Sequence, residues 1–135
     1  MSIELPEARI FAEQMQEALP GKGIESIDSQ DMKRMLELGV GKEHFFDFGS
    51  IVGRTVEAVT SRGNTIRIKM SGGFNIVHGP EYGGRIRLVQ PGEKVPKYHL
   101  KLEFSDSSVL SMRNTGMGVI YALKDEHLHE AYLYK

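Results

Sequence analysis

Apolar side chains near the N-terminus recur at intervals of three and four residues, the spacing that gathers side chains on one face of an α-helix. The residues on this face are Ala8, Phe11, Ala12, Met15, Ala18 and Leu19. Pro6 suits the first turn of a helix, where its missing N–H costs nothing, and Pro20 and Gly21 stop the helix. The pattern therefore predicts an amphipathic helix over residues 7–19.

From Arg54 onward the hydrophobic period falls to two, which is typical of β-strands. The alternation predicts that Val56, Ala58 and Thr60 share one face of the first strand in this region. Further strands are predicted over residues 24–27, 66–70, 74–78, 85–89, 98–104, 109–112 and 119–123. Residues 31–38 fit a helical turn or a ragged strand, and residues 43–48 fit a short helix. Short alternating strands separated by frequent turns indicate a sandwich or a barrel.

The length and composition indicate one domain that covers residues 1–135. The chain contains no cysteine, which excludes disulfides, thiol catalysis and cysteine-ligated zinc. Its first residues lack the basic and then apolar order of a signal peptide, and no apolar stretch has the length of a membrane span. We therefore expect an intracellular, cytoplasmic protein that has no membrane partner.

The net charge of −1 argues against a strongly basic nucleic-acid-binding protein, but the charge is spread unevenly along the chain. Residues 1–47 contain ten acidic and five basic residues, whereas residues 48–135 contain eight acidic and twelve basic residues, counting Lys and Arg only. Two interpretations stay open: the basic residues form one positive surface, or they occupy the outward positions of alternating strands.

The remaining candidate motifs favour structural roles. His127 and His129 lie two residues apart, which does not suit a helical zinc pair, and we expect a solvated tail there. His78 and His99 fall within strand patterns and are expected to be core or cross-strand residues. The glycines of residues 79–84 do not match a nucleotide-binding motif, because they join two strands instead of opening a helix. No metal site and no cofactor are predicted.

The N-terminus carries a more specific signal. Residues 3–8 read Ile-Glu-Leu-Pro-Glu-Ala and lead directly into the predicted helix and the antiparallel strands. This order resembles the formamidopyrimidine-DNA glycosylase and endonuclease VIII family, whose members begin, after the initiator methionine, with Pro-Glu-Leu-Pro-Glu-Val or a close variant. The family resemblance is weaker but still present, at corresponding positions, in residues 19–24, 62–66 and 97–102. The resemblance implies an α+β fold: a two-layer antiparallel β-sandwich with a flanking N-terminal α-helix.

The resemblance also implies a covalent chemistry that uses the N-terminal amine. An α-amine titrates near pH 8, so a usable fraction is unprotonated at neutral pH. In the family this amine attacks C1′ of a damaged nucleoside and forms a Schiff base, and strand cleavage follows by β-elimination. Glu4 and Glu7 match the two acidic positions of the family. Ile3 stands at the place of the nucleophilic proline, and Ser2 precedes it as an extra residue, so the implied catalytic residues are Ser2, Ile3, Glu4 and Glu7.

The partner implied by the resemblance is damaged double-stranded DNA, with the base flipped out and the gap filled by wedge side chains. The DNA-binding residues inferred from the resemblance and from the basic strand positions are Arg62, Asn64, Arg85, Arg113 and Met117. Arg67 and Arg87 are further candidates for the same positive surface. Residues 114–118 stand where the family has an Asp-Pro-Arg-Arg-Phe-Gly loop, and they lack both arginines and the aromatic residue. Family members continue into a helix–two-turn–helix domain and a zinc finger.

Three functions remain in competition at this point. The first is a base-excision DNA glycosylase and abasic-site lyase, which we predict. The alternative is a catalytically degraded domain of the same fold that serves as a DNA-binding or interaction module. The third is a protein of another class in which the Glu-Leu-Pro-Glu start is a coincidence.

Overall fold

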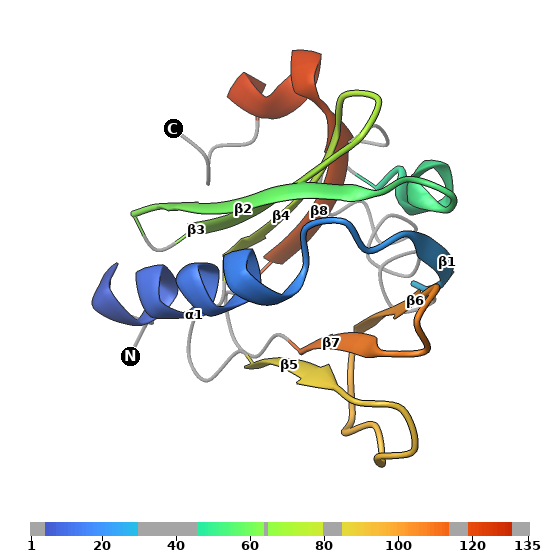
Figure 1. The fold of residues 1–135 in the computed structure, drawn as a ribbon. Helices are drawn as coiled ribbons and strands as arrows, with labels where there is room; N and C mark the ends of the chain where they lie inside the picture. The colour runs from blue at the N-terminus through green and yellow to red at the C-terminus, as the bar shows by residue number, and fades with distance from the viewer. Residues whose placement is uncertain (1–4, 30–45, 64, 80–84, 114–118, 131–135) are drawn as a thin grey trace.

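Two four-stranded antiparallel sheets and one long helix make up the structure, a computed structural model that describes residues 5–29, 46–63, 65–79, 85–113 and 119–130 (Figure 1). Sheet I has the strand order β1-β6-β7-β5, with bounds Ile24–Asp28, Leu100–Phe104, Val109–Arg113 and Arg85–Val89. Sheet II has the order β2-β3-β4-β8, with bounds Val56–Arg62, Thr65–Met70, Phe74–Gly79 and Val119–Lys124. The two-layer antiparallel sandwich predicted from the resemblance is confirmed.

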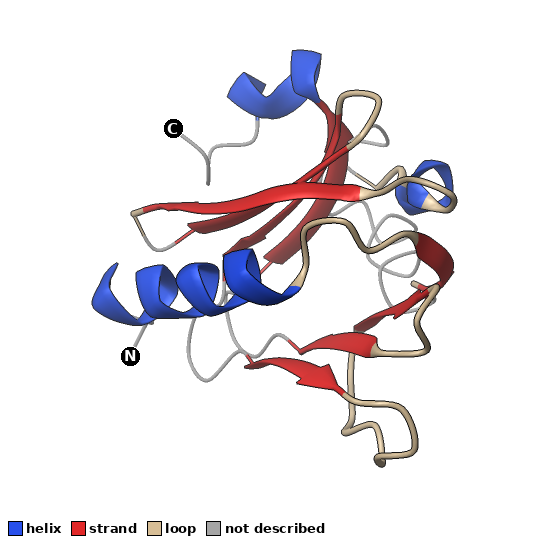
Figure 2. Cartoon of the chain, viewed as in Figure 1, coloured by secondary structure: helices blue, strands red, loops and turns tan. Residues whose placement is uncertain are grey.

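The N-terminal helix α1 spans Leu5–Ala18 and lies along one open side of the sandwich (Figure 2). Its side chains, described from Ala8 onward, bury Ala8, Ala12 and Met15 and leave the opposite face exposed. The helix packs on β2 and β3, where the side-chain oxygen of Gln16 accepts a hydrogen bond of 2.6 Å from the backbone N–H of Val59. The helical periodicity of the sequence therefore predicted the element and most of its buried face, although Ala18, expected on that face, is exposed and Phe11 is half-buried.

A β-bulge interrupts β2 and changes which of its residues face the core. The pairing register of β2 with β3 shifts between Val56 and Ala58. Because a bulge inserts one extra residue, the side chains beyond it change faces. Val56 and Val59 are both buried, whereas Thr60 is exposed. The prediction that Val56, Ala58 and Thr60 share one face is therefore wrong, and strict alternation could not have revealed the bulge.

The main core fills the space between the two sheets and α1. Its largest fully buried side chains include Phe104, Leu102 and Leu100 of β6 and Ile66 and Ile68 of β3. A second apolar cluster lies apart from this core and consists of Val77, Tyr121 and Leu123, with Phe46 and Leu128 packed against it. The rings of Phe46 and Tyr121 meet edge to face, with 5.7 Å between their centroids. Sheet II is consequently apolar on both faces along β4 and β8.

The segment after β8 is more ordered than the solvated tail that the sequence suggested. Asp125–Glu130 forms the 3-10 helix η3, in which Leu128 is half-buried against the second cluster. His127 lies 2.5 Å from Glu130, measured between Nδ1 and Oε2. A second 3-10 helix, η2, spans Phe48–Ile51. The segment 31–38 and residues 43–45 of the predicted helix over 43–48 fall outside the described residues, whereas Phe46 forms an isolated β-bridge with Ala122 and Phe48 begins η2.

Arg67 is held against sheet II by a polar network and does not project as a free cation. Its Nε donates a hydrogen bond of 2.7 Å to the side-chain oxygen of Asn75, and its guanidinium lies 3.4 Å from a carboxylate oxygen of Asp125. Asn75 is fully buried and donates to the same Asp125 oxygen at 2.8 Å. Arg67 was one of four arginines expected to include contributors to a positive surface, and in the structure its guanidinium interacts with Asn75 and Asp125 within the fold.

Lys22 joins the exit of α1 to the turn between β6 and β7. Its ammonium donates to a carboxylate oxygen of Asp106 and, at 3.0 Å, to the hydroxyl of Ser108. The hydrogen bond from Lys22, reinforced by those from Ser108, holds the pKa of Asp106 well below its usual range. A carboxylate with a depressed pKa stabilises the fold above its unfolded-state pKa, and this contribution is lost as the pH falls toward the folded-state value.

Asp106→Asn should therefore lower the urea midpoint at pH 7, and the difference from the parent should shrink as the pH falls below about 4. The reason is that the carboxylate of the unfolded parent becomes protonated in this range, so folding requires release of a proton and the stabilisation by the charge decreases. Urea denaturation of both proteins at pH 7 and at pH 3 measures the effect. A difference in midpoint that is equal at the two pH values would contradict the assignment.

Candidate nucleic-acid interface

One end of the sandwich collects the chain connections that flank the predicted DNA-binding residues. In sheet II, Arg62 pairs with Thr65 across the β2–β3 connection, and Gly79 pairs with Val119 where β4 ends and β8 begins. In sheet I, Arg85 at the start of β5 pairs with Arg113 at the end of β7. The N-terminal end of α1 points the same way (Figure 1). We call this region the loop end. It is bounded by the first turn of α1 and by Arg62, Thr65, Gly79, Arg85, Arg113 and Val119.

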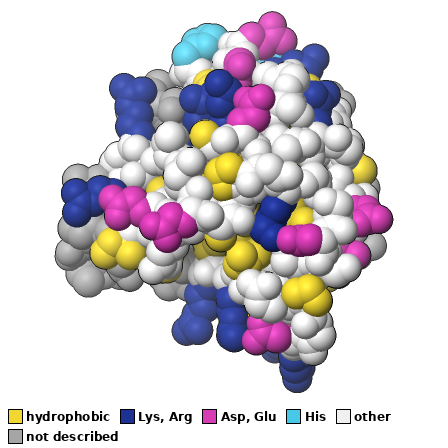
Figure 3. All heavy atoms as spheres, in the orientation of Figure 1, with side chains coloured by type: hydrophobic (Ala, Val, Ile, Leu, Met, Phe, Trp, Pro, Cys, Tyr) yellow, Lys and Arg dark blue, Asp and Glu magenta, His cyan; other side chains and the backbone are white. Residues whose placement is uncertain are grey.

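Three arginines lie together on the outer face of sheet I beside the loop end. Arg85 and Arg113 face each other across β5 and β7, and Arg87 follows two residues along β5 on the same face. All three side chains are exposed. Figure 3 shows Lys and Arg side chains grouped on this part of the surface. Within the described part of the chain, none of the three guanidinium groups forms an ion pair.

This arrangement favours an anionic partner. Arg85 and Arg113 are like charges directly opposite each other on neighbouring strands, and such pairs destabilise a sheet. Arg87 instead lies opposite the neutral Ser111 of β7. Arginine guanidinium groups bind phosphate and carboxylate oxygens through two parallel hydrogen bonds. Phosphates or carboxylates from outside the described chain can therefore relieve the repulsion between Arg85 and Arg113.

The structure describes only some of the other predicted site residues. Arg62 is exposed at the end of β2, on the opposite sheet from Arg85 but at the same end of the fold. Glu7 lies in the first turn of α1, and its side chain is outside the described residues. Ser2, Ile3, Glu4, Asn64 and Met117 also fall outside them, so their roles stay predictions. The structure thus brings Arg62, Arg85 and Arg113 to the same end of the fold as the start of α1.

The described residues contain no group of three or more His, Asp or Glu side chains placed to bind a metal ion. Within the same ranges, no helix is long and apolar enough to cross a membrane. His78 is fully buried in β4, in agreement with the core position expected from its strand pattern.

The structure is thus a two-layer antiparallel sandwich flanked by an N-terminal helix, with Arg62, Arg85 and Arg113 at the same end of the fold as the start of that helix (Figure 1). The family model described as the formamidopyrimidine-DNA glycosylase N-terminal domain matches residues 3–116, and the chain belongs to this family.

Individual relatives agree with this family assignment. The chain is 29% identical over 107 residues to a formamidopyrimidine-DNA glycosylase from an Exiguobacterium species, which covers 79% of this chain and 38% of the relative. It superposes on the Lactococcus lactis enzyme solved with DNA containing N7-benzyl-Fapy-dG, with a TM-score of 0.77, 18% identity, and coverage of 97% of this chain and 47% of that one.

The same Lactococcus lactis enzyme, solved non-covalently bound to DNA containing an abasic site, gives a TM-score of 0.76 at 18% identity, with 97% of this chain and 48% of that chain covered. At this level of identity the likeness establishes the fold. The chain spans about half the length of these solved relatives and 38% of the curated one.

Proposed function

We propose that this chain acts in base-excision DNA repair as the N-terminal domain of a DNA glycosylase and abasic-site lyase. The observation that carries the proposal is the loop end, where the start of α1 and the exposed side chains of Arg62, Arg85 and Arg113 lie at one end of the fold. Such a domain needs its nucleophile close to cations that hold the DNA backbone. Its substrate would be damaged double-stranded DNA inside the cell.

The proposed reaction begins with the neutral N-terminal amine, which removal of Met1 would place on Ser2, one residue before Ile3. The amine nitrogen forms a bond to C1′ of the damaged nucleoside while the bond from C1′ to the base breaks. Loss of the amine proton and opening of the sugar ring give a Schiff base. Glu4 and Glu7 would exchange protons with the amine, the sugar and the leaving base. β-Elimination from this intermediate then cleaves the strand.

The DNA contacts divide between charge and shape. Arg62, Arg85 and Arg113 would bind backbone phosphates, which position the duplex without reading its sequence. Asn64, two residues after Arg62 in the sequence, would add a polar contact. Met117 would act as an apolar wedge in the space left by the flipped nucleotide.

A second candidate is a DNA-binding module of the same fold that has lost the chemistry. Ile3 replaces the proline of the family, and Ser2 adds a residue before it. Residues 114–118 read Asn-Thr-Gly-Met-Gly and lack the arginines and the aromatic side chain that the family uses. These departures weaken the positioning of an amine at C1′ without affecting phosphate contacts at Arg62, Arg85 and Arg113.

Binding to an abasic duplex tests the shared part of both candidates. If three phosphates are contacted, affinity should fall about 40-fold between 50 and 200 mM salt, because each contact releases condensed counterions. Arg113→Ala should reduce the slope of log affinity against log salt by about 0.9. Fluorescence anisotropy with a labelled duplex measures both quantities.

Lys94→Ala is the matched control, because Lys94 is an exposed cation in the turn at the far end of β5. This substitution should leave the affinity and the salt slope unchanged. If Lys94→Ala and Arg113→Ala reduce the slope equally, the binding is diffuse and the loop end is not the interface. If the parent chain does not bind the abasic duplex at 50 mM salt, the proposed DNA-binding function itself is refuted.

A further inference from the structure

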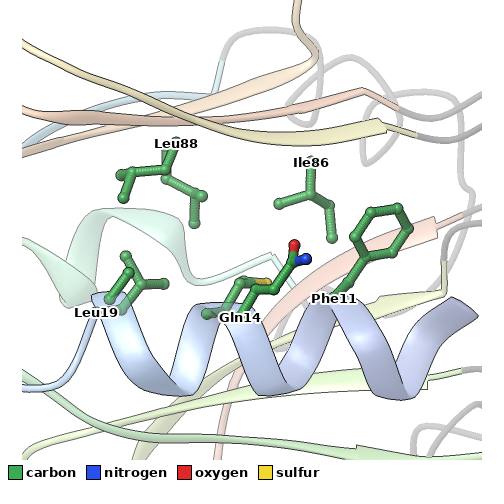
Figure 4. Close-up of a pocket in the computed structure, with 8 residues that line it drawn as sticks. Phe11, Gln14, Leu19, Ile86 and Leu88 are labelled. Carbon is green, nitrogen blue, oxygen red and sulfur yellow. The ribbon is translucent and has the colours of Figure 1, made fainter.

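A second surface lies between α1 and β5, on the open side of the sandwich. A groove of about 220 Å³ runs between the two elements (Figure 4). Its lining comes from one face of α1 and from the inward side chains of β5 and β7: Phe11, Gln14, Met15, Ala18, Leu19, Ile86, Leu88 and Leu110. Figure 3 shows hydrophobic side chains on the surface next to the group of basic ones. The lining is apolar except for Gln14.

The strand that borders this groove has an unpaired edge. In the described part of the chain, β5 is the last strand of sheet I, and its pairing is with β7 alone. The outer edge of such a strand presents backbone N–H and C=O groups that can pair with an added strand. An added strand would continue the sheet beside β5 and place alternate side chains on its two faces.

The two faces of β5 specify what that added strand should contain. On the inner face, half-buried Ile86 and Leu88 line the groove, so inward residues of the added strand should be apolar. On the outer face, Arg85 and Arg87 are exposed and form no ion pair within the described part of the chain. Cross-strand pairs of opposite charge stabilise a sheet, so the outward residues should be acidic.

The same charges argue against a second copy of this chain as the occupant. Two β5 strands that pair edge to edge would bring Arg85 and Arg87 of one copy beside the same arginines of the other. Like charges opposite each other on adjacent strands are unfavourable. The occupant therefore belongs to a different segment, which carries acidic residues.

We propose that the edge of β5 and the groove beside it bind an extended peptide segment in which apolar and acidic residues alternate. The segment adds as a fifth strand to sheet I, with its apolar residues in the groove against α1 and its carboxylates beside Arg87 and Arg85. Arg87 determines the preference for an acidic peptide more than Arg85 does, because Arg87 lies two residues further along β5 from the loop end. This binding requires no DNA and does not depend on the proposed repair function.

The test uses this chain and a synthetic ten-residue peptide in which valine or leucine alternates with glutamate. We expect saturable binding in a fluorescence anisotropy titration, and chemical-shift changes in the amide NMR spectrum of the chain that include β5. The same peptide with lysine in place of glutamate should bind at least tenfold more weakly. Arg87→Glu should reverse the order, so that the lysine peptide binds better than the glutamate peptide.

Ala18→Glu tests the groove, because Ala18 is exposed on α1 and lines it, so the substitution changes the surface without opening the core. It should weaken binding of the glutamate peptide at least tenfold. Thr60→Glu is the matched control, since it places the same charge on an exposed position of β2. Equal weakening by Ala18→Glu and Thr60→Glu would overturn the proposal. Binding that ignores the charge of the peptide, or a dimer that forms through β5 without peptide, would also overturn it.

Discussion

Acetylation of the N-terminal amine should abolish any covalent adduct that this chain forms with abasic DNA in the presence of borohydride. Borohydride reduces the Schiff base between amine and C1′ to a stable secondary amine, so the adduct reports directly on the nucleophile. The chain has no cysteine, and the resemblance places the nucleophile at the N-terminus. Trapping on a gel, with mass mapping of the adduct to the terminal residue, measures the effect.

The experiment requires protein whose N-terminal residue has been sequenced, because retention of Met1 would move the amine. Glu4→Gln should slow formation of the adduct while the α-amine stays intact, since it removes a proton-transfer group but not the nucleophile. An adduct that survives acetylation would refute the role of the amine. If an active glycosylase traps in parallel and this chain binds the duplex without trapping, the chain is the DNA-binding module and the chemistry has been lost.

Much of the fold follows from periodicity that the sequence displays openly. The three- and four-residue spacing before Leu19 predicted α1, and alternation predicted the strands of both sheets within about two residues of their observed ends. The bulge after Val56 could not be predicted, because a bulge depends on how β2 meets β3 and α1. The order of strands within each sheet is likewise a property of contacts between distant segments.

The candidate site was harder to predict from the sequence than the fold was. Arg67 and Arg87 both occupy alternating strand positions and are equivalent in the sequence pattern. In the structure Arg67 is bonded to Asn75 and Asp125, whereas Arg87 is exposed, because their neighbours come from other strands. The groove beside β5 was also missed, although the alternation of Ile86 and Leu88 with arginines marks a strand whose two faces differ.

Phe104→Ala should lower the free energy of unfolding by about 3–5 kcal/mol, the usual cost of truncating a fully buried phenylalanine. Phe104 has no exposed surface and lies at the end of β6, where it pairs with Ile24 of β1. The ammonium of Lys22 lies 5.7 Å from the centre of its ring. The substitution removes the packing that joins β1, β6 and the exit of α1. Urea denaturation followed by circular dichroism measures the loss.

Val52→Ala is the matched control, since Val52 is 43% exposed and its truncation should change stability by less than about 0.5 kcal/mol. Phe104→Leu retains most of the volume and should cost less than about 1.5 kcal/mol. A cost below 1.5 kcal/mol for Phe104→Ala would show that the site collapses around the cavity, contrary to expectation.

Phe104 also separates stability from binding, because it lies at the opposite end of sheet I from Arg113. In the pairing of β6 with β7, Leu100 lies opposite Met112 next to the loop end, and Glu103 lies opposite Val109 at the far end. Since a domain of this size typically has about 5–15 kcal/mol of stability, Phe104→Ala should leave a folded population at low temperature. That population should bind the abasic duplex with the parent affinity and salt slope. A loss of affinity in the folded variant would mean that the far end of the sandwich helps to shape the loop end.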